Sequence, residues 1–459
     1  MNSLNAPTKP ARARVAGRSP AGAAVLSFLW PGLGQLYTGR RRLAVLFALP
    51  AFLVLVLLAY ELRQGAMVFA ARFADPSFSQ AAVAVVFVLG LWRVWAVGHA
   101  FASGEQRRTR RAFDRLVLCA LAAAIVVSHA GAGYLLAETS GAGSQLFGQG
   151  NSDLIDQATP GGSQGPGSSL PAPAVNGRIT ILFTGVDAAP SRSEHLYDSI
   201  MVVSYDPQTN SVQMVSVPRD SASFPFYFGG VDSAKTKINS VPTYVRNGWI
   251  KSPDSPYITL VKEVSYLVGI PINYYAVMDL NGFTRMIDMV GGIDVVNAGV
   301  IADPTYDWLD GHVGLFYLAA GPQHLDGKTA LAYVRSRHGT NNSDWKRASR
   351  QQDVVVALLH KMAQPSQLLK LPGLISTVGS SVTTTFPADK VADYVAMAQD
   401  VPSKNFSQVV LGPPYSVTGI SSATASTCLV NAKVAALSVQ LFGTDSTWYG
   451  KPAPRDTCP

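Results

Sequence analysis

Charged side chains are scarce in this sequence. Asp, Glu, Lys and Arg make up 14% of its 459 residues, whereas apolar residues make up 48%, a bias typical of proteins with membrane segments. The net charge of +8 is uneven, because its basic clusters lie beside apolar runs. This placement favours a role in membrane topology over binding to nucleic acid.

Several functional signatures are also missing. The sequence has no zinc-type Cys/His spacing, no zipper heptads, no RNA-binding signature and no GxSxG elbow. GPQHLDGKT (321–329) resembles a phosphate-binding P-loop, but its two glycines are one residue too far apart for that motif. We interpret it as a turn before the next element, so ATP hydrolysis is disfavoured.

Cysteine is nearly absent, with three residues. Cys119 falls within an apolar run, where it is expected to act as a small apolar side chain. Cys428 and Cys458 both fall in the C-terminal tail. In an exported region this pair predicts a disulfide, whereas in a cytosolic domain it would be two thiols.

The segment 22–137 is predicted to be a membrane region. Three of its apolar runs approach the length of about 20 residues that a helix needs to span a bilayer. They are 43–60, 81–101 and 116–137. A shorter run at 23–37 is interrupted by proline and glycine and has basic residues on both sides, so we expect an interfacial or re-entrant segment.

Positive charges beside these runs predict their orientation. Cytoplasmic loops are enriched in Lys and Arg, so the basic N-terminus (1–21) and the clusters at 40–42 and 107–111 are expected inside the cell. Everything after Glu138 is then outside, in a multi-pass membrane protein. Four full spans would instead leave that remainder in the cytoplasm.

The chain changes character after the membrane region. Residues 138–177 are rich in Gly, Ser, Gln and Pro and predict a flexible linker. Strand and helix patterns then alternate over 178–414, which indicates an α/β domain with a central sheet covered on both faces. Within it, ALAYVRSR (330–337) is expected to be a strand, and 343–362 to contain a helix. The tail, 415–459, holds the cysteine pair.

Arginines cluster around the junction of that expected strand and helix. In a strand, Arg335 and Arg337 would share one face. In the helix, Arg347, Arg350 and Gln351 fall at i, i+3 and i+4, and the same face continues as apolar residues. A solvated basic face is the alternative, but a helix face that turns apolar points toward a core. Arginines there favour a buried phosphate, which guanidinium groups bind in bidentate fashion.

Acidic residues lie near the ends of neighbouring strands. Asp187 ends one expected strand, and Asp198 follows in the next segment. Each could be only a cap or turn residue, but two carboxylates also suit Mg²⁺, which takes its other ligands from phosphate and water. Arg219 and Asp220 end a third strand, and ligands of α/β sheets gather at strand ends. The mixture predicts a site for a pyrophosphate and a divalent metal.

Several motifs then occur in a fixed order: ILFTGVD followed by Asp198-Ser199, VSVPRD, KINS, DLNGFTRMIDMVGGIDV, HLDGKTALAYVRSR and DWKRASRQQDVV. On these motifs, about half of the chain, from residue 178 to 400, resembles the LytR-CpsA-Psr family of bacterial cell-wall proteins. The resemblance implies a three-layer α/β/α sandwich with an apolar pocket for a polyprenyl tail.

The resemblance also implies an activity and a location. Family members are phosphotransferases that move a glycopolymer from a polyprenyl-pyrophosphate carrier onto peptidoglycan through a phosphodiester bond. The expected cofactor is Mg²⁺, with Mn²⁺ as an alternative. The catalytic domain is expected on the extracellular side of the bacterial cell membrane.

Site residues are implied by the matched motifs. Asp187 and Asp198 match the metal-binding acids, and Arg219 matches the arginine at the leaving pyrophosphate. The groups expected to hold the phosphates are Arg335, Arg337, Arg347 and Gln351. The motif positions Asp220, Lys237 and Asp344 are expected to act at the site or to support it, and either Asp187 or Asp220 is expected to assist deprotonation of the attacking hydroxyl.

Two departures from the family pattern stand out. Many members carry an arginine two residues before the second acid, where this chain has Leu196, and Arg192 is the candidate substitute. A single anchor helix is common in the family, whereas about three are predicted here. Two other functions are compatible with the same residues: a polyprenyl-pyrophosphate pyrophosphatase that uses water, and a non-catalytic lipid-binding or regulatory membrane protein of the transcriptional-attenuator type.

Overall fold

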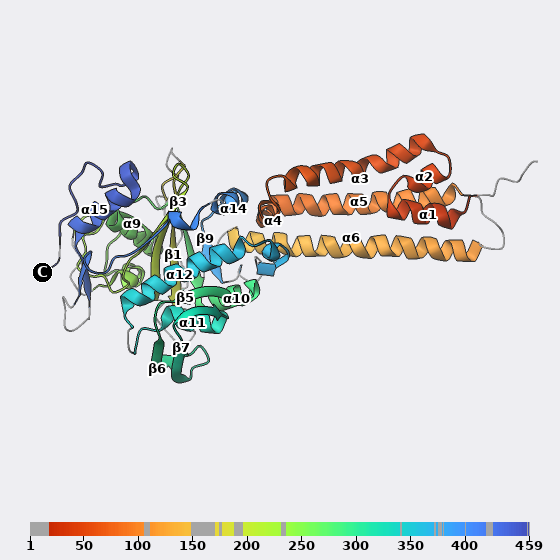
Figure 1. Ribbon diagram of the computed structural model, residues 1–459. Coiled ribbons are helices and arrows are strands. Elements are labelled where there is room, and N and C mark those ends of the chain that lie inside the picture. Colours follow the sequence, from red (N-terminus) through yellow and green to blue (C-terminus); the bar gives the residue numbers. More distant parts are fainter. Residues whose placement is uncertain are drawn as a thin grey trace, which may run out of the picture. The chain divides into compact units, whose positions relative to one another are not determined.

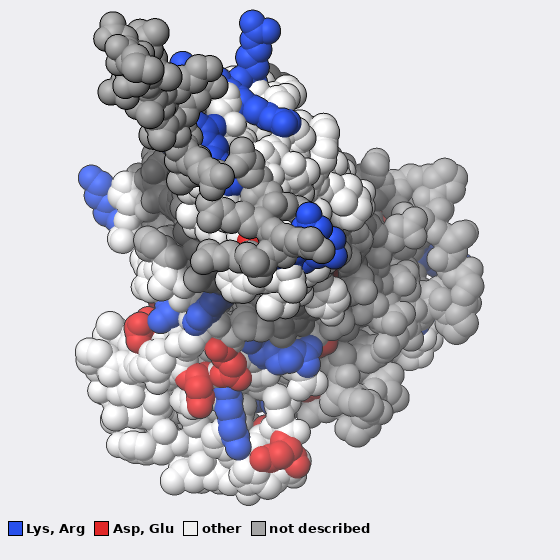
Figure 2. Space-filling model, turned by 90° about the vertical axis from the view of Figure 1, so that its right-hand side faces the viewer, with Lys and Arg blue, Asp and Glu red and all other residues white. Residues whose placement is uncertain are grey.

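The structure is a computed structural model. It describes residues 18–104, 111–147, 170–173, 177–187, 196–230, 236–339, 342–370, 373–374, 379, 381–399, 401–418, 426–456 and 458. The chain divides into two compact units. One comprises Met1–Arg63 and Gln80–Ala137, and the other comprises Gln64–Ser79 and Glu138–Pro459. In Figure 2, uncharged residues cover most of the described surface in view, in keeping with the low charge content of the sequence.

Long apolar helices make up the first unit. Its helices are α1 (Pro20–Leu29), α2 (Leu33–Tyr37), α3 (Arg41–Leu62), α5 (Pro76–Ala102) and α6 (Arg111–Phe147), of which α5 and α6 extend into the second unit (Figure 1). Among the described residues, α3, α5 and α6 are long and apolar enough to cross a membrane. Each of the predicted spans lies inside one of them.

The short apolar run folds into α1 and α2, joined by a Pro-Gly turn. Gln35 is fully buried, accepts a hydrogen bond from the Ser27 hydroxyl at 2.8 Å and donates one to the Ala96 carbonyl at 2.8 Å. Arg93 of α5 donates to the Phe28 carbonyl at 2.7 Å. Polar groups in an apolar unit are costly unless a neighbouring helix satisfies them, as these contacts do for the Gln35 amide and for one nitrogen of Arg93.

A six-stranded sheet with the order β10-β3-β2-β1-β4-β9 forms the centre of the second unit. Its strands are β1 (Ile179–Asp187), β2 (Leu196–Asp206), β3 (Ser211–Ser216), β4 (Tyr274–Asp279), β9 (Val382–Thr384) and β10 (Phe406–Val410). β1 pairs in parallel with β4, and β3 with β10, while the other neighbours are antiparallel. The fold is therefore mixed α/β, as the sequence predicted.

Side chains of this sheet alternate between two hydrophobic clusters. Ile200 and Val202 pack with α9 (Pro256–Val268) in one cluster, whereas Met201 and Met214 pack with α12 (Asp344–Met362) in the other. Because successive side chains of a strand point to opposite faces, helices cover both faces of the sheet. The other α-helices among the described residues of this unit include α4 (Ala66–Ala71), α8 (Val241–Arg246), α10 (Leu280–Val290), α11 (Gly327–Arg335), α14 (Val391–Gln399) and α15 (Asn431–Phe442).

Another hydrophobic cluster lies between α10, α11, α12 and two small antiparallel sheets. These sheets pair β5 with β8 and β6 with β7. The strands are β5 (Ile293–Asn297), β6 (Ile301–Asp307), β7 (Val313–Leu318) and β8 (Gly321–Leu325).

The prediction of a strand at 330–337 is wrong, because these residues form most of α11 and the loop after it. The Asp326 side chain caps the helix by accepting a hydrogen bond from the Thr329 N–H at 2.7 Å. A short apolar run fits either a buried strand or a buried helix, so periodicity alone could not decide. The capping residue Asp326 is the feature of the sequence that distinguishes a helix from a strand here.

The predicted linker is only partly described. Its first ten residues, 138–147, continue α6, so they are helical. Most of the rest, 148–169 and 174–176, lies outside the described residues.

The tail after Pro414 does not stand apart from the domain. Strands β11 (Ser416–Thr418) and β12 (Thr427–Leu429) pair with each other, and Leu429 and Phe442 belong to the same hydrophobic cluster as the central sheet. Cys428 and Cys458 form a disulfide with a Cα–Cα distance of 5.5 Å. The core therefore continues beyond the boundary expected near 414.

Candidate functional site

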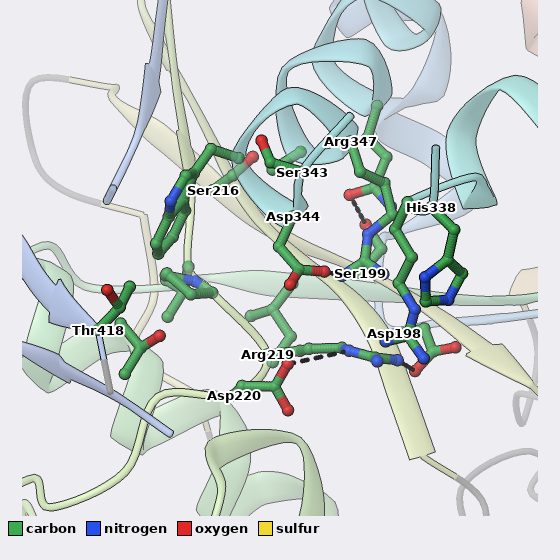
Figure 3. Close-up of a pocket in the computed structure, with 18 residues that line it drawn as sticks. Asp198, Ser199, Ser216, Arg219, Asp220, His338, Ser343, Asp344, Arg347 and Thr418 are labelled. Atoms are coloured by element: carbon green, nitrogen blue, oxygen red, sulfur yellow. Dashed lines mark hydrogen bonds and ion pairs between the residues drawn. The ribbon is translucent and has the colours of Figure 1, made fainter. Parts of the chain in front are cut away.

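Two cavities meet at the edge of the sheet where β1 and β3 end and β2 begins. Predicted site residues that line the larger one, of about 480 Å³, are Asp198, Arg219, Asp220, Arg337, Arg347 and Gln351 (Figure 3). The smaller one, of about 200 Å³, is lined by Arg335 and by all of these predicted residues except Asp220. The residues shared by both walls are Asp198, Arg219, Arg337, His338, Arg347 and Gln351.

Asp198 owes its place to a β-bulge. The β1–β2 register shifts between Gly185 and Val186, which pair with Ser199 and Tyr197, so Asp198 is the extra residue on β2. Bulges redirect side chains and are common beside functional sites. Asp198 and Ser199 both line the larger cavity.

Arg219 lies between two carboxylates (Figure 3). Its Nη1 forms an ion pair with Asp198, and its Nε lies 3.5 Å from Asp220 Oδ2. Burial lowers the pKa of Arg219, but Asp198 and Asp220 outweigh burial and raise it overall. Arg219 is therefore a permanent cation held in place at the centre of the site.

Asp220 is held by a second cation. Lys237 Nζ lies 2.6 Å from Asp220 Oδ1. Burial raises the pKa of Asp220, but the Lys237 hydrogen bond and the Arg219 charge lower it overall. A carboxylate with a lowered pKa is a weak base, so Asp220 positions Arg219 better than it would deprotonate a hydroxyl. Lys237 does not line either described cavity and supports Asp220.

Arg347 is the most confined cation of the shared wall. Its residue is 7% exposed, and Nη2 lies 3.0 Å from Asp344 Oδ1, whose own side chain is half exposed. Burial lowers the pKa of Arg347, the carboxylates of Asp344 and Asp198 offset this only in part, and the positive charges of Arg219 and Arg337 add to the lowering. A bound anion would relieve both the desolvation and the repulsion.

Gln351 lies one helical turn after Arg347 and bridges two elements. It accepts a hydrogen bond from the Ser199 hydroxyl at 3.1 Å and donates one to the Val334 carbonyl at 3.2 Å. The side chain thereby links β2 to α11 at the cavity wall.

Arg350 does not join this group, although the sequence placed it on the same helical face. It donates to the Tyr333 carbonyl at 2.7 Å, to Asn342 Oδ1 at 2.9 Å and to the Ser336 carbonyl. Burial lowers its pKa to about 10. Its partners are protein groups of α11 and of the loop after it, so no buried anion is needed to explain it.

The last residue of α11 and the loop after it provide the two remaining arginines. Arg335 ends the helix, lies 3.5 Å from Asp187 Oδ2 through Nη2, and lines the smaller cavity. Ser336 donates to Asp303 at 2.9 Å, which ties the loop to β6. Arg337 follows, is exposed, lines both cavities and has no acidic partner among the described residues. The shared strand face expected for Arg335 and Arg337 does not exist, yet both arginines reach the site.

Asp187 is 3% exposed and lines neither described cavity, and its Oδ2 lies 3.5 Å from Nη2 of Arg335, which lines the smaller one. Leu196 pairs with Asp187 across β1 and β2. Arg192, the candidate substitute for the missing arginine, lies outside the described residues.

The donor set limits which metal the site could hold. Asp187 ends β1 and pairs with Leu196, two residues before the bulge residue Asp198 on β2. Among the described residues, no group of three or more His, Cys, Asp or Glu side chains could hold a metal ion. Two carboxylates fit Mg²⁺, which takes its other ligands from phosphate and water, but do not form a complete protein site.

Several lining residues were not anticipated. They are Ser199, Ser216, His338, Ser343, Trp345, Thr418 and Thr427. Ser199 and Trp345 directly follow the predicted residues Asp198 and Asp344, so their position in the sequence could have identified them. Thr418 and Thr427 come from the tail, and no local pattern placed that tail beside Asp220.

Comparisons with known proteins agree with the motifs. The family model described as the LytR_cpsA_psr family matches residues 146–434, more than half of the chain. The polyisoprenyl-teichoic acid–peptidoglycan teichoic acid transferase TagV of Bacillus subtilis (strain 168) is 30% identical over 226 residues, which cover 48% of this chain and 52% of that protein. TagU of Bacillus anthracis (strain CDC 684 / NRRL 3495), with the same transferase description, is 32% identical over 216 residues, or 47% and 63% of the two chains.

The chain thus spans between half and two thirds of these relatives. A crystal structure of B. subtilis TagV has 24% sequence identity and a TM-score of 0.45, and the match covers 57% of this chain and 95% of that one. The extent of the family match decides the classification: the chain belongs to the LytR_cpsA_psr family.

Proposed function

We propose that this protein is a phosphotransferase that moves a glycopolymer from a polyprenyl-pyrophosphate carrier onto peptidoglycan through a phosphodiester bond. The observation that carries the proposal is the shared wall of the two cavities, where buried Arg347 lies among other cations. Arginines of this kind suit a pyrophosphate. The relatives described as teichoic acid transferases support the same activity.

The reaction needs one bond formed and one broken. A hydroxyl oxygen of the acceptor glycan forms a bond to the phosphorus that carries the glycopolymer. The bond from this phosphorus to the bridging oxygen breaks, and prenyl phosphate leaves with the bridging oxygen and the hydroxyl proton. Arg219, Arg337 and Arg347 stabilise the negative charge that develops on the departing phosphate, which is the larger part of catalysis in phosphoryl transfer.

Mg²⁺ is part of the proposal, with Asp198 and Asp187 as its carboxylate ligands. When bound, the ion neutralises charge on the pyrophosphate oxygens. The protein groups also have roles of their own. Asp198 orients Arg219, and Arg335, which lines the smaller cavity, is paired with Asp187.

We also propose a location. The three apolar helices anchor the protein in the bacterial cell membrane, and the α/β domain, in the three-layer arrangement of its family, works on the extracellular side. A lipid-linked donor would then meet the site at the membrane surface.

The test uses the full-length protein in lipid nanodiscs with lipid-linked donor, a peptidoglycan fragment and Mg²⁺. Mass spectrometry should detect a phosphodiester-linked product, chelation with EDTA should abolish it, and added Mg²⁺ should restore it. Activity that survives exhaustive chelation would remove the metal from the proposal. Release of prenyl phosphate without a glycan product would identify a pyrophosphatase, and binding of the donor with no bond broken would identify a lipid-binding protein.

A further inference from the structure

The two cavities differ outside their shared wall. The smaller one adds Arg335 and residues of β6. The larger one adds hydroxyl groups, two carboxylates and an indole. They belong to Ser199, Ser216, Asp220, Ser343, Asp344, Trp345, Thr418 and Thr427. Outside the shared wall, the larger cavity is therefore lined by polar groups but by no Lys or Arg. This lining suits a neutral polar ligand better than a second phosphate.

Trp345 offers a flat apolar surface in this wall. It is the second residue of α12 and is half-buried. Gly412 lies against one side of the indole, because a Cβ at Gly412 would come within 3.1 to 3.4 Å of three ring atoms. The close backbone contact supports the ring from behind, and no acceptor for its Nε1–H is present among the described residues.

Two threonines of the tail complete this part of the wall. Thr418 and Thr427 are directly opposite each other in the β11–β12 pair. Within the described part of the chain, neither hydroxyl is engaged in a hydrogen bond. The Thr427 N–H donates to the Asp220 carbonyl at 3.0 Å, and the Ala222 N–H donates to the Thr427 carbonyl at 2.8 Å, so β12 is anchored to the segment after β3 that carries Arg219 and Asp220. Both hydroxyls are therefore held in place and available to a ligand.

We propose that this part of the larger cavity binds a sugar ring of the acceptor glycan. The indole of Trp345 stacks on the C–H face of the ring, and the two threonine hydroxyls and the exposed carboxylate of Asp344 bind its hydroxyl groups. A sugar seated there lies beside Arg219 and Arg347, where the attacked phosphorus would be. The inference rests on the proposed transferase function and adds which residues recognise the acceptor.

The test compares Trp345→Ala, Trp345→Phe and Thr427→Val in the full-length protein in nanodiscs. Transfer is measured against the concentration of a soluble peptidoglycan oligosaccharide, and release of prenyl phosphate to water is measured without it. Trp345→Ala should raise the KM for the oligosaccharide by roughly tenfold, as loss of an aromatic contact does, while release to water stays unchanged. Trp345→Phe should recover most of the loss, and Thr427→Val should raise the same KM by a few-fold. Trp249→Ala is the control, since Trp249 is 67% exposed and lines neither cavity.

An unchanged KM in Trp345→Ala would overturn the inference. So would a parallel loss of transfer and of release to water, because that result marks Trp345 as structural support. Direct binding of the oligosaccharide, measured by calorimetry, separates this inference from the proposed function. If the wild-type protein makes no transfer product but binds the oligosaccharide, and Trp345→Ala does not, the subsite stands and the transferase proposal fails.

Discussion

At the scale of single residues, five nearby arginines have different roles. Arg219 forms ion pairs with two carboxylates, Arg350 donates to oxygens of α11 and of the loop after it, and Arg335 is paired with Asp187. Arg337 and Arg347 retain the most unbalanced charge. Sequence spacing placed Arg347 and Arg350 on one helical face, yet Arg347 lines both cavities, whereas Arg350, three residues later, is bound to backbone carbonyls.

Arg347→Ala should reduce transfer by about tenfold to a hundredfold, because hydrogen bonds to charged groups contribute about 1.5–3 kcal/mol each. Thermal stability should change little, since the partner of Arg347 is the half-exposed Asp344. Lys346→Ala is the matched control: Lys346 precedes Arg347, is exposed and lines neither cavity. Equal losses in both variants, in steady-state transfer assays, would mean that the face is misassigned.

Arg350→Met should have the opposite effect: a loss of thermal stability with little direct effect on transfer. Methionine keeps the apolar stem of the side chain but leaves the buried carbonyls of Tyr333 and Ser336 without their donor. The free energy of unfolding should therefore fall by about 3 kcal/mol. Melting curves of the purified protein measure this loss. A melting temperature equal to wild type, combined with a large loss of donor binding, would instead place Arg350 among the phosphate ligands.

At the scale of elements, the site depends on irregular features more than on regular ones. A bulge in β2 presents Asp198, a helix end presents Arg335, and an N-terminal helical turn presents Arg347. The tail sheet adds Thr418 and Thr427. Because the tail belongs to the core and to the cavity wall, its disulfide affects more than the end of the chain.

Replacing Cys428 and Cys458 by serine should lower stability by about 3 kcal/mol, as expected for a closed loop with a sequence separation of 30 residues. Cys428 follows Thr427, so the acceptor KM should rise as well. Thermal unfolding with and without reductant measures the first effect. Cys119→Ser, which leaves the disulfide intact, is the control, and an identical melting temperature in oxidised and reduced wild-type protein would contradict the expectation.

At the scale of the whole molecule, membrane orientation decides whether the site can meet an extracellular acceptor. The helices α3, α5 and α6 are the candidates for crossing the membrane. An odd number of crossings from a cytoplasmic N-terminus leads to the outside, whereas an additional crossing by α1 and α2 would reverse the outcome. The α1–α2 turn and its buried Gln35 favour a hairpin that does not cross.

A reporter active only after export should be active when fused after Ser140 and inactive when fused after Gly104. A reporter active only in the cytoplasm should give the reverse pattern. Activity of the cytoplasmic reporter after Ser140 would rule out three crossings from a cytoplasmic N-terminus. Both fusions are tested in cells, with expression levels matched by immunoblot.

The sequence by itself determined the apolar helices, the mixed α/β class, the family and most charged residues of the site. These depend on local composition, on periodicity and on motifs that are contiguous in the chain. It did not determine that 330–337 contains a helix, because a short buried run has no decisive period and only its Asp326 cap marked the choice.

Only the tertiary structure decided which charges act together. It separated Arg350 from Arg347, paired Asp220 with Lys237, and brought Thr418 and Thr427 beside the start of α12. The physical reason is that helical or strand spacing fixes the direction of a side chain but not its partner. A guanidinium binds whichever buried acceptor lies within reach, and that acceptor can come from a distant segment: Arg335 pairs with Asp187, which is 148 residues away in the sequence.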